Sequence, residues 1–127
     1  MSAQSEGEPI TIGLSQTAHG KLQRLKEDGY FAEMADGYRF AVALALAHGV
    51  SVPRLGGSRV TIFNVGSLDP DRSVHIAVSA LREEVDEPVY RTVERLAEWG
   101  VDELYRRVQD QGRLSVAEIV AEAESLT

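Results

Sequence analysis

The segment FAVALALAHGV, residues 40–50, has no polar side chain from Phe40 to Ala47. Leucine and alanine favour the helical state, so we expect a helix here that is apolar on every side. His48 in its last turn and Gly49 directly after it indicate where this helix ends. A helix without a hydrated face has to be buried on all sides. The question is therefore which other segments pack against it.

The residues before this helix predict a strand and a second helix. In ITIGLS, residues 10–15, apolar and polar side chains alternate, which is typical of a short strand with one buried face. Ser15 can then cap a helix, because its hydroxyl can accept a hydrogen bond from a first-turn amide. Ala18, Leu22 and Leu25 share one face of that helix, and Gly29 suits the residue after its end. We expect Asp36 to cap the apolar helix that follows.

The residues after position 50 predict one more strand and several helices. RVTIFNV, residues 59–65, is rich in β-branched and aromatic residues and predicts a strand, and LGGS before it predicts a turn. A helix should follow with Asp69 as its cap and Pro70 in its first position. Separate helices are expected before and after Gly100. Ser115 and Glu118 form a capping box before the apolar positions Ile119, Val120 and Ala123.

These patterns predict a mainly α fold with one or two short strands. We expect a disordered tail over residues 1–9, a strand–helix–helix–strand unit over 10–66 and an acidic helical lobe over 67–127. The two parts could also form one continuous domain. The chain of 127 residues is long enough for either arrangement.

The charge of the chain is concentrated in its C-terminal half. The formal net charge is −7. Residues 1–66 hold six basic and six acidic residues, whereas residues 67–127 hold seven basic and fourteen acidic residues, which accounts for the whole net charge. An acidic surface repels nucleic acid and anionic membranes, so any contact with DNA should come from the N-terminal half.

Composition also narrows the cellular setting and the chemistry. There is no cysteine, which excludes disulfides and thiolate chemistry, and no apolar run reaches the roughly 18 residues of a membrane span. The N-terminal residues lack the pattern of a signal peptide, so a cytoplasmic location is expected. His19, His48 and His75 are far apart, and Asp69 and Asp71 suit a helix start better than an ion site. We therefore expect no catalytic residues, no bound metal, no cofactor and no enzymatic activity.

The order strand, amphipathic helix, apolar helix over residues 10–50 resembles that of the ribbon-helix-helix DNA-binding proteins. The resemblance implies that the strand pairs with the same strand of a second copy, and that the apolar helices of the two copies cross. Phe40, Val42, Leu44 and Leu46 would then lie at a homodimer interface, which would cover the apolar helix. The alternative is that the other helices of the same chain wrap around it.

The same resemblance implies a DNA-binding surface. Outward-facing residues of the strand, Thr11, Gly13 and Ser15, would enter the major groove. Gly13 departs from the pattern because it presents no side chain, and Glu33 and Asp36 near the apolar helix would repel phosphate. The basic residues that could hold the DNA backbone are Lys21, Arg24, Lys26, Arg39, Arg54 and Arg59.

Two functional hypotheses follow. The first is a non-enzymatic DNA-binding or DNA-associated regulator that acts as a homo-oligomer. The chain also resembles, more distantly, small accessory proteins of bacterial DNA-modification and phage-defence systems. The second is an interaction subunit that docks on a partner protein through its acidic C-terminal helices, without binding DNA.

Overall fold

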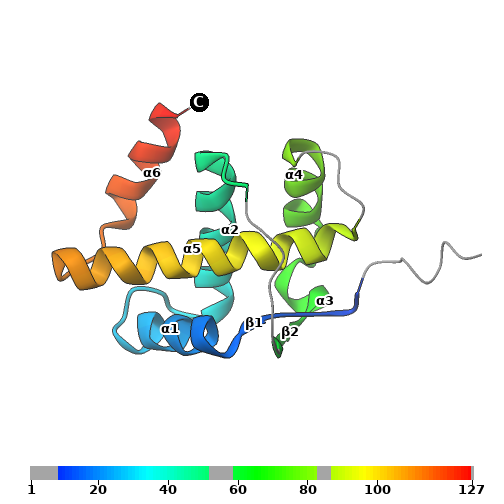
Figure 1. Cartoon of the computed structure of the whole chain (residues 1–127), viewed down its shortest axis with the longest axis horizontal. Helices are drawn as coiled ribbons and strands as arrows, with labels where there is room; N and C mark the ends of the chain where they lie inside the picture. The colour runs from blue at the N-terminus through cyan, green and yellow to red at the C-terminus, as the bar shows by residue number, and fades with distance from the viewer. Residues whose placement is uncertain (1–8, 52–58, 83–86, 127) are drawn as a thin grey trace, which may run out of the picture.

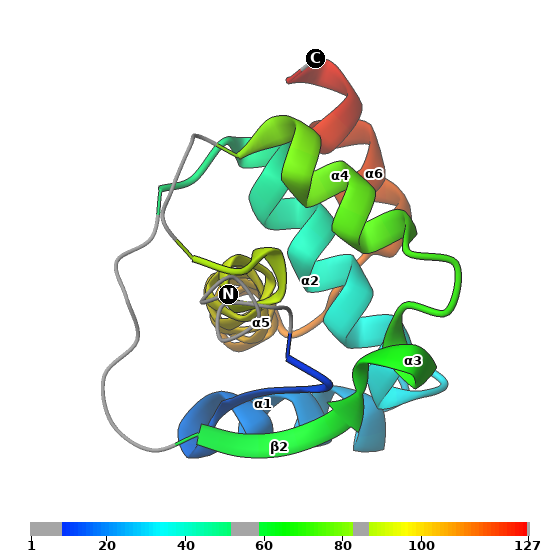
Figure 2. The same cartoon turned by 90° about the vertical axis from the view of Figure 1, so that its right-hand side faces the viewer.

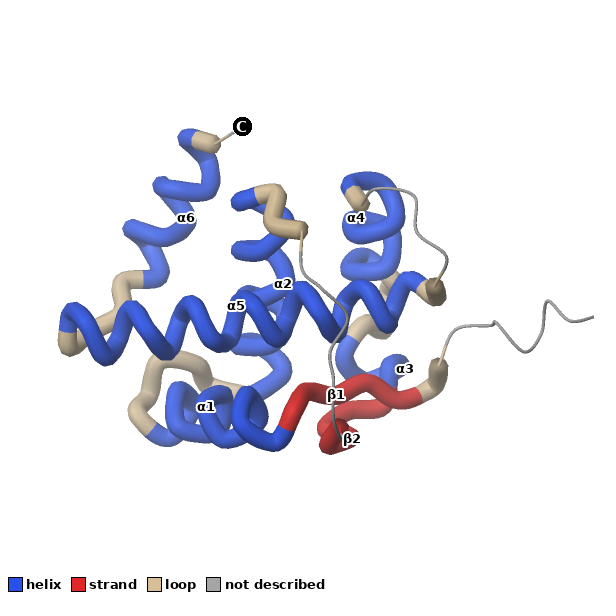
Figure 3. The backbone as a smooth tube through the Cα atoms, viewed as in Figure 1, coloured by secondary structure: helices blue, strands red, loops and turns tan. Residues whose placement is uncertain are grey.

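The computed structural model describes residues 9–51, 59–82 and 87–126. This part of the chain forms six helices and a two-stranded sheet (Figure 3), which confirms the mainly α fold. In chain order the elements are β1 (Thr11–Ser15), α1 (Gln16–Glu27), α2 (Met34–His48), β2 (Arg59–Asn64), α3 (Val65–Leu68), α4 (Ser73–Leu81), α5 (Val89–Gln111) and α6 (Val116–Ser125). The expected tail over residues 1–9 and the expected LGGS turn lie almost entirely outside the described residues.

The apolar helix α2 lies at the centre of the molecule and is covered by its own chain. The long helix α5 crosses it, α1 packs near its start, and α4 and α6 lie on its two sides (Figures 1 and 2). Val42 and Leu44 are each only 2% exposed within the single chain. Both side chains are therefore covered without a second copy, mostly by α5, and the homodimer interface with Phe40, Val42, Leu44 and Leu46 stays a prediction.

The sheet pairs β1 with β2 of the same chain. The two strands are antiparallel, with Thr11 opposite Asn64 and Ser15 opposite Arg59, and the register shifts between Ile12 and Gly13. The resemblance to ribbon-helix-helix proteins implied that this strand pairs with a second copy. That expectation is wrong, because β2 of the same chain occupies one edge of β1. In addition, carboxylates of α5 accept hydrogen bonds from backbone N–H groups of β1.

Helix α5 is continuous through Gly100, where the sequence analysis placed a boundary between two helices. The residue has a structural role in the interior of the helix, since a Cβ atom at Gly100 would lie 2.1 Å from the carbonyl oxygen of Ala41. Gly100 therefore allows α5 to cross close to the backbone of α2. This crossing joins residues 10–66 and 67–127 in one hydrophobic core.

Two helix starts also differ from the expected positions. Helix α2 begins three residues earlier than predicted from its cap, so Asp36 lies in its first turn and Glu33 occupies the cap position. Helix α4 begins at Ser73 rather than at Pro70, and the short helix α3 was not predicted. Asp69 still binds the start of α4 from a distance, because its carboxylate accepts hydrogen bonds from the N–H groups of Val74 and His75.

The structure confirms the other helix ends that were predicted from glycine and the helix starts that were predicted from serine. Gly29 and Gly49 follow α1 and α2 with φ angles of 85° and 63°, the left-handed conformation that glycine adopts easily. Ser15 caps α1 and Ser115 caps α6 through their hydroxyl oxygens. None of the helices over the described ranges is both long enough and apolar enough to cross a membrane.

Candidate functional site

The strand residues expected to contact DNA are mostly turned into the molecule. Gly13 is buried, and a Cβ atom there would lie 1.9 Å from the carbonyl oxygen of Val60 on β2. The hydroxyl of Ser15 accepts from the N–H of Ala18 and donates to the carboxylate of Glu98. Thr11 is half-buried, opposite Asn64. The prediction of an outward-facing surface is therefore corrected for Gly13 and Ser15, which hold β1 against β2 and α5, and stays a prediction for Thr11.

Two carboxylates of α5 that the sequence analysis did not single out fix β1 in place. Glu94 is 1% exposed and accepts a hydrogen bond from the N–H of Gly13 at 2.9 Å. It also forms ion pairs with Arg91 and Arg59, at 2.9 and 3.1 Å. Glu98 accepts from the N–H of Ser15 at 3.0 Å. These groups satisfy the backbone of β1 as a paired strand would.

A buried tyrosine completes this arrangement around Gly13. The hydroxyl of Tyr38 donates to the carbonyl oxygen of Gly13 at 2.9 Å. Burial, and then the negative charge of Glu94, raise the pKa of Tyr38 well above its ordinary value. The phenol therefore stays protonated and remains a donor, which is a structural rather than a catalytic role.

The basic residues proposed for DNA binding do not form one free positive surface. On α1, Lys21 pairs with Asp102 of α5 and Arg24 pairs with Asp28 at 3.2 Å, while Lys26 is exposed beside Glu27. Arg39 of α2 pairs with Asp36 at 3.2 Å and donates to the carbonyl oxygen of Leu68. Each of these cations except Lys26 therefore has an acidic partner, which weakens the attraction of the surface for phosphate. Arg54 lies outside the described residues.

The two aspartates considered as metal ligands, Asp69 and Asp71, have other partners. Both oxygens of Asp69 are engaged, one of them by the hydroxyl of Tyr90 at 2.8 Å, and Asp71 accepts from the N–H of Ser73. This N–H lowers the pKa of Asp71, as expected for an acid at a helix start. Within residues 9–51, 59–82 and 87–126, no three histidine or acidic side chains are grouped as metal ligands would be.

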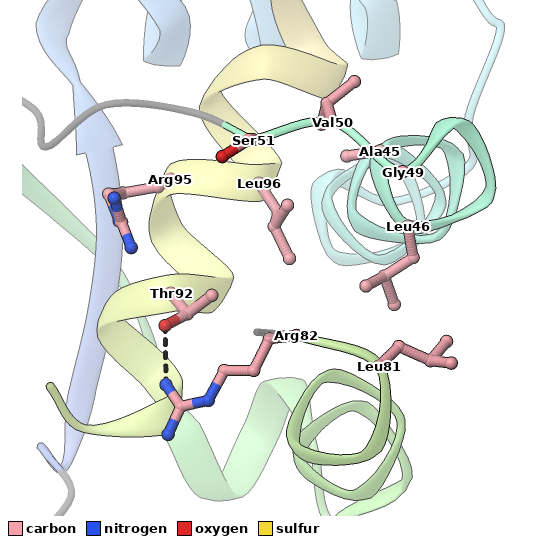
Figure 4. Close-up of a pocket in the computed structure, with 10 residues that line it drawn as sticks. All are labelled: Ala45, Leu46, Gly49, Val50, Ser51, Leu81, Arg82, Thr92, Arg95 and Leu96. Atoms are coloured by element: carbon pink, nitrogen blue, oxygen red, sulfur yellow. Dashed lines mark hydrogen bonds between the residues drawn. The ribbon is translucent and has the colours of Figure 1, made fainter. Parts of the chain in front are cut away.

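A cavity of about 310 Å³ lies between α2, α4 and α5 (Figure 4). It has apolar walls, including Leu46 and Leu96, and two arginines at its border. Their donor groups are already engaged: Arg82 donates to the hydroxyl of Thr92 at 2.7 Å, and Glu87 accepts from both Thr92 and Arg95. A polar ligand would find these donors already engaged, so the cavity is a weaker candidate site than the groove on the other side of α2.

This groove, of about 300 Å³, lies between α2 and α6. Its α2 side is formed by Phe40, Ala43, Leu44 and Ala47, which are spaced as one stripe along a helix. Its α6 side is formed by Ile119, Val120, Ala123 and Glu124. Ile119 and Leu44 are buried at its base, whereas Ala43 is exposed and Val120 is 42% exposed. Ala43 thus lies on the side of α2 that the rest of the chain covers least. An apolar face of α6 lies next to that side and extends the apolar surface.

Helix α6 is held beside α2 by several defined contacts, so the groove exists without a ligand. The hydroxyl of Ser115 caps helix α6. Among the described residues of α6, the apolar side chain that is buried is Ile119. Glu122 accepts two hydrogen bonds from Arg107 of α5, at 3.0 and 2.9 Å, and lies 2.7 Å from Nε2 of His48. The bonds from Arg107, opposed by burial, lower the pKa of the Glu122 carboxyl.

The predicted site residues are therefore placed in three different regions. Thr11, Gly13 and Ser15 belong to the sheet, and the basic residues are spread over α1 and α2. Of the predicted interface residues, Phe40 and Leu44 border the groove. Leu46 borders the cavity on the other side. The apolar face that the sequence predicted for the last helix, with Ile119, Val120 and Ala123, is the same face that lines the groove.

Comparison of the chain with models of protein families, with curated proteins and with solved structures finds no match in any of the three. The groove between α2 and α6 is therefore interpreted from its own geometry and charge.

Proposed function

We propose that this chain is a non-catalytic interaction subunit that binds a partner protein through the groove between α2 and α6. The observation that carries the proposal is the lining of the groove, in which every residue except Glu124 is apolar. Partly exposed apolar side chains gain free energy when a partner removes them from water. The groove is also preformed, because Ser115, Ile119 and Glu122 fix α6, and preformed sites bind with little reorganisation.

The DNA-binding regulator remains a prediction with less support. Its strongest element is the exposed side of α1, where Arg24 and Lys26 are accessible. The acidic neighbours Glu27, Asp28 and Asp102 reduce the net charge of that side to near zero. Binding to the DNA backbone needs several cations that release counterions together, and α1 offers few. The homodimer, and the likeness to accessory proteins of phage defence, are likewise proposals that experiments must test.

The proposal can be tested with a photo-crosslinking amino acid in the full chain. We would place benzoylphenylalanine at Val116, which is one helical turn from Val120 on the same side of α6 and is 38% exposed. The matched control carries the same probe at Gln23, an exposed position of α1. In the cells from which the protein comes, we expect a discrete crosslinked product from position 116 only. The substitution Ala43→Arg, which places a charged side chain in the groove, should remove it.

The outcome separates the proposed function from its alternatives. Equal products from both positions, or a product from position 116 that survives Ala43→Arg, would contradict binding in the groove. A product with twice the mass of the chain would identify a second copy as the occupant, as the homodimer hypothesis predicts. For the regulator, a gel shift with duplex DNA at low salt should be insensitive to Ala43→Arg and weakened when Lys21 and Arg24 are replaced by alanine.

A further inference from the structure

We infer that the element bound in the groove is an amphipathic helix of another protein, with basic side chains on both sides of its apolar stripe. This inference rests on the proposed function and specifies the chemistry of the partner. It is argued from three features of the groove: its lack of a strand edge, the spacing of its small residues and the charge around it.

The first feature concerns the backbone of the occupant. Both walls of the groove are helix surfaces, and a helix bonds its interior N–H and C=O groups within itself; Ala47, Ala123 and Glu124 lie in last turns. The only polar side chain that lines the groove is Glu124. An extended segment would find no continuous row of partners there for its own backbone groups, and buried unpaired groups are costly. A helix satisfies its backbone internally and can bury one apolar face, so it is the form of chain that this surface can accept.

The second feature is the shape of the α2 wall. Phe40, Ala43 and Ala47 lie at positions i, i+3 and i+7, a straight stripe about 10 Å long given the rise of about 1.5 Å per residue. The two alanines leave the middle of the stripe shallow, and Phe40 closes one end. Such a surface fits two or three turns of a second helix, with apolar side chains at the same spacing lying over the alanines.

The third feature is the charge of α6. Within Val116–Ser125 this helix has three glutamates, Glu118, Glu122 and Glu124, and no basic residue. Glu122 is paired with Arg107 and His48, whereas the contact of Glu118 with Arg113 is exposed and 3.4 Å long, which is a weak interaction. On the α2 side, the exposed Asp36 lies one turn before Phe40 and is paired with Arg39 at 3.2 Å. Around the groove, the four acids Asp36, Glu118, Glu122 and Glu124 therefore outnumber the three arginines that pair with them, and this excess favours a basic partner.

The same charges argue against a second copy of this chain as the occupant. Two copies with a net charge of −7 each would repel, and a two-fold arrangement would bring α6 close to the α6 of the other copy. The surface of this protein offers no exposed basic amphipathic helix among the described elements, since the cations of α1 are paired with acids or lie beside them.

The experiment uses two synthetic helical peptides of about 14 residues with the same leucine stripe. One carries lysine at the positions beside the stripe and the other carries glutamate. Each peptide is labelled and titrated with the full chain, and binding is followed by fluorescence anisotropy. We expect the lysine peptide to bind about tenfold more tightly than the glutamate peptide. The difference should shrink when the salt concentration rises from about 50 to about 500 mM.

Three variants of the chain assign the binding to the groove. Ala43→Arg should abolish binding of the lysine peptide. Ala121→Arg is the matched control, because Ala121 is exposed on α6 but does not line the groove, and it should leave binding nearly unchanged. The double substitution Glu118→Gln and Glu124→Gln should remove most of the preference for lysine over glutamate. Circular dichroism checks that each variant retains its helices.

The results distinguish failure of the inference from failure of the proposed function. Equal or tighter binding of the glutamate peptide, abolished by Ala43→Arg, would overturn the basic partner and leave the groove as a binding site. Binding that survives Ala43→Arg would overturn both statements. If neither peptide binds while crosslinking from position 116 still gives a groove-dependent product, the inference is overturned and the interaction subunit stands. If neither peptide binds and no such product forms, both are wrong.

Discussion

Replacing Gly100 with alanine tests whether the close crossing of α2 and α5 organises this fold. The added Cβ atom would lie 2.1 Å from the carbonyl oxygen of Ala41 and 2.7 Å from its Cα atom. Nonbonded heavy atoms are most stable at roughly 3.5–4.0 Å, so the two helices would have to separate by about 1 Å or more. The obstructing atoms belong to backbone, which cannot rotate away as a side chain could.

The size of the effect follows from two opposing contributions. Overpacking of a well-packed core costs about 1–3 kcal/mol, and the rigid backbone contact places this site near the upper end. Alanine is favoured over glycine in a helix by about 0.8–1 kcal/mol, which offsets part of that cost. We therefore expect Gly100→Ala to lower the free energy of unfolding by about 2 kcal/mol.

A second glycine in a helix supplies the control for this measurement. Gly20 lies within α1, is exposed, and has nothing within 4 Å of the position of an added Cβ atom. Gly20→Ala should raise the stability by about 0.5–1 kcal/mol through helix propensity alone. Urea unfolding followed by circular dichroism measures both variants. If Gly100→Ala were as stable as the wild type or as Gly20→Ala, the proposed role of the close crossing would be refuted.

Three further predictions concern the buried acid, the attachment of α6 and the state of assembly. Glu94→Gln should lower the free energy of unfolding by about 2–3 kcal/mol. This is below the range of about 3–5 kcal/mol for a fully buried pair, because the arginine partners of Glu94 reach solvent. If urea unfolding showed the same loss for Glu94→Gln as for the exposed Glu27→Gln, the prediction would be contradicted. Arg107 lowers the pKa of Glu122. The contribution of Glu122 to stability is therefore present above the ordinary carboxyl pKa of about 4.3 and is lost as the pH falls through the lower folded value. The stability of the Glu122→Gln variant should lack this part of the acid dependence, and an unchanged acid transition would argue against the contact. Light scattering tests the homodimer prediction, since a dimer has twice the chain mass of 13.9 kDa, and a mass of one chain at all concentrations would exclude it.

Much of the secondary structure could be predicted because its signals are local. Ser15 and Ser115 cap helices through contacts within three residues, and Gly29 and Gly49 end helices through their own backbone angles. Gly100 could not be assigned in this way. A glycine can end a helix or allow a close approach, and the difference here depends on Ala41, which lies 59 positions earlier in the chain.

The strand that pairs with β1 likewise could not be predicted from the local sequence pattern. Alternation over residues 10–15 predicts a strand with one buried face, but the same alternation suits pairing with a second copy or with β2. What decides between them is the arrangement of Glu94 and Glu98 on α5, which bind the backbone of β1. Glu94 had a recognisable signal, because it lies four positions after Tyr90 and three before Ala97, two buried residues of α5. A carboxylate within an apolar stripe indicates a buried partner.

The alanines of α2 separate the requirements of folding from those of binding. Ala41 faces Gly100 and is fully buried, and Ala45, one turn later, is buried as well. Ala43 and Ala47 lie about 200° further around the helix, given about 3.6 residues per turn, and line the groove beside α6. Larger side chains at Ala41 should therefore destabilise the fold, whereas larger side chains at Ala43 should block the groove and leave the fold intact. An apolar helix that appeared to need complete cover is covered on the side where α5 crosses, and the opposite side keeps a shallow surface on which another helix can pack.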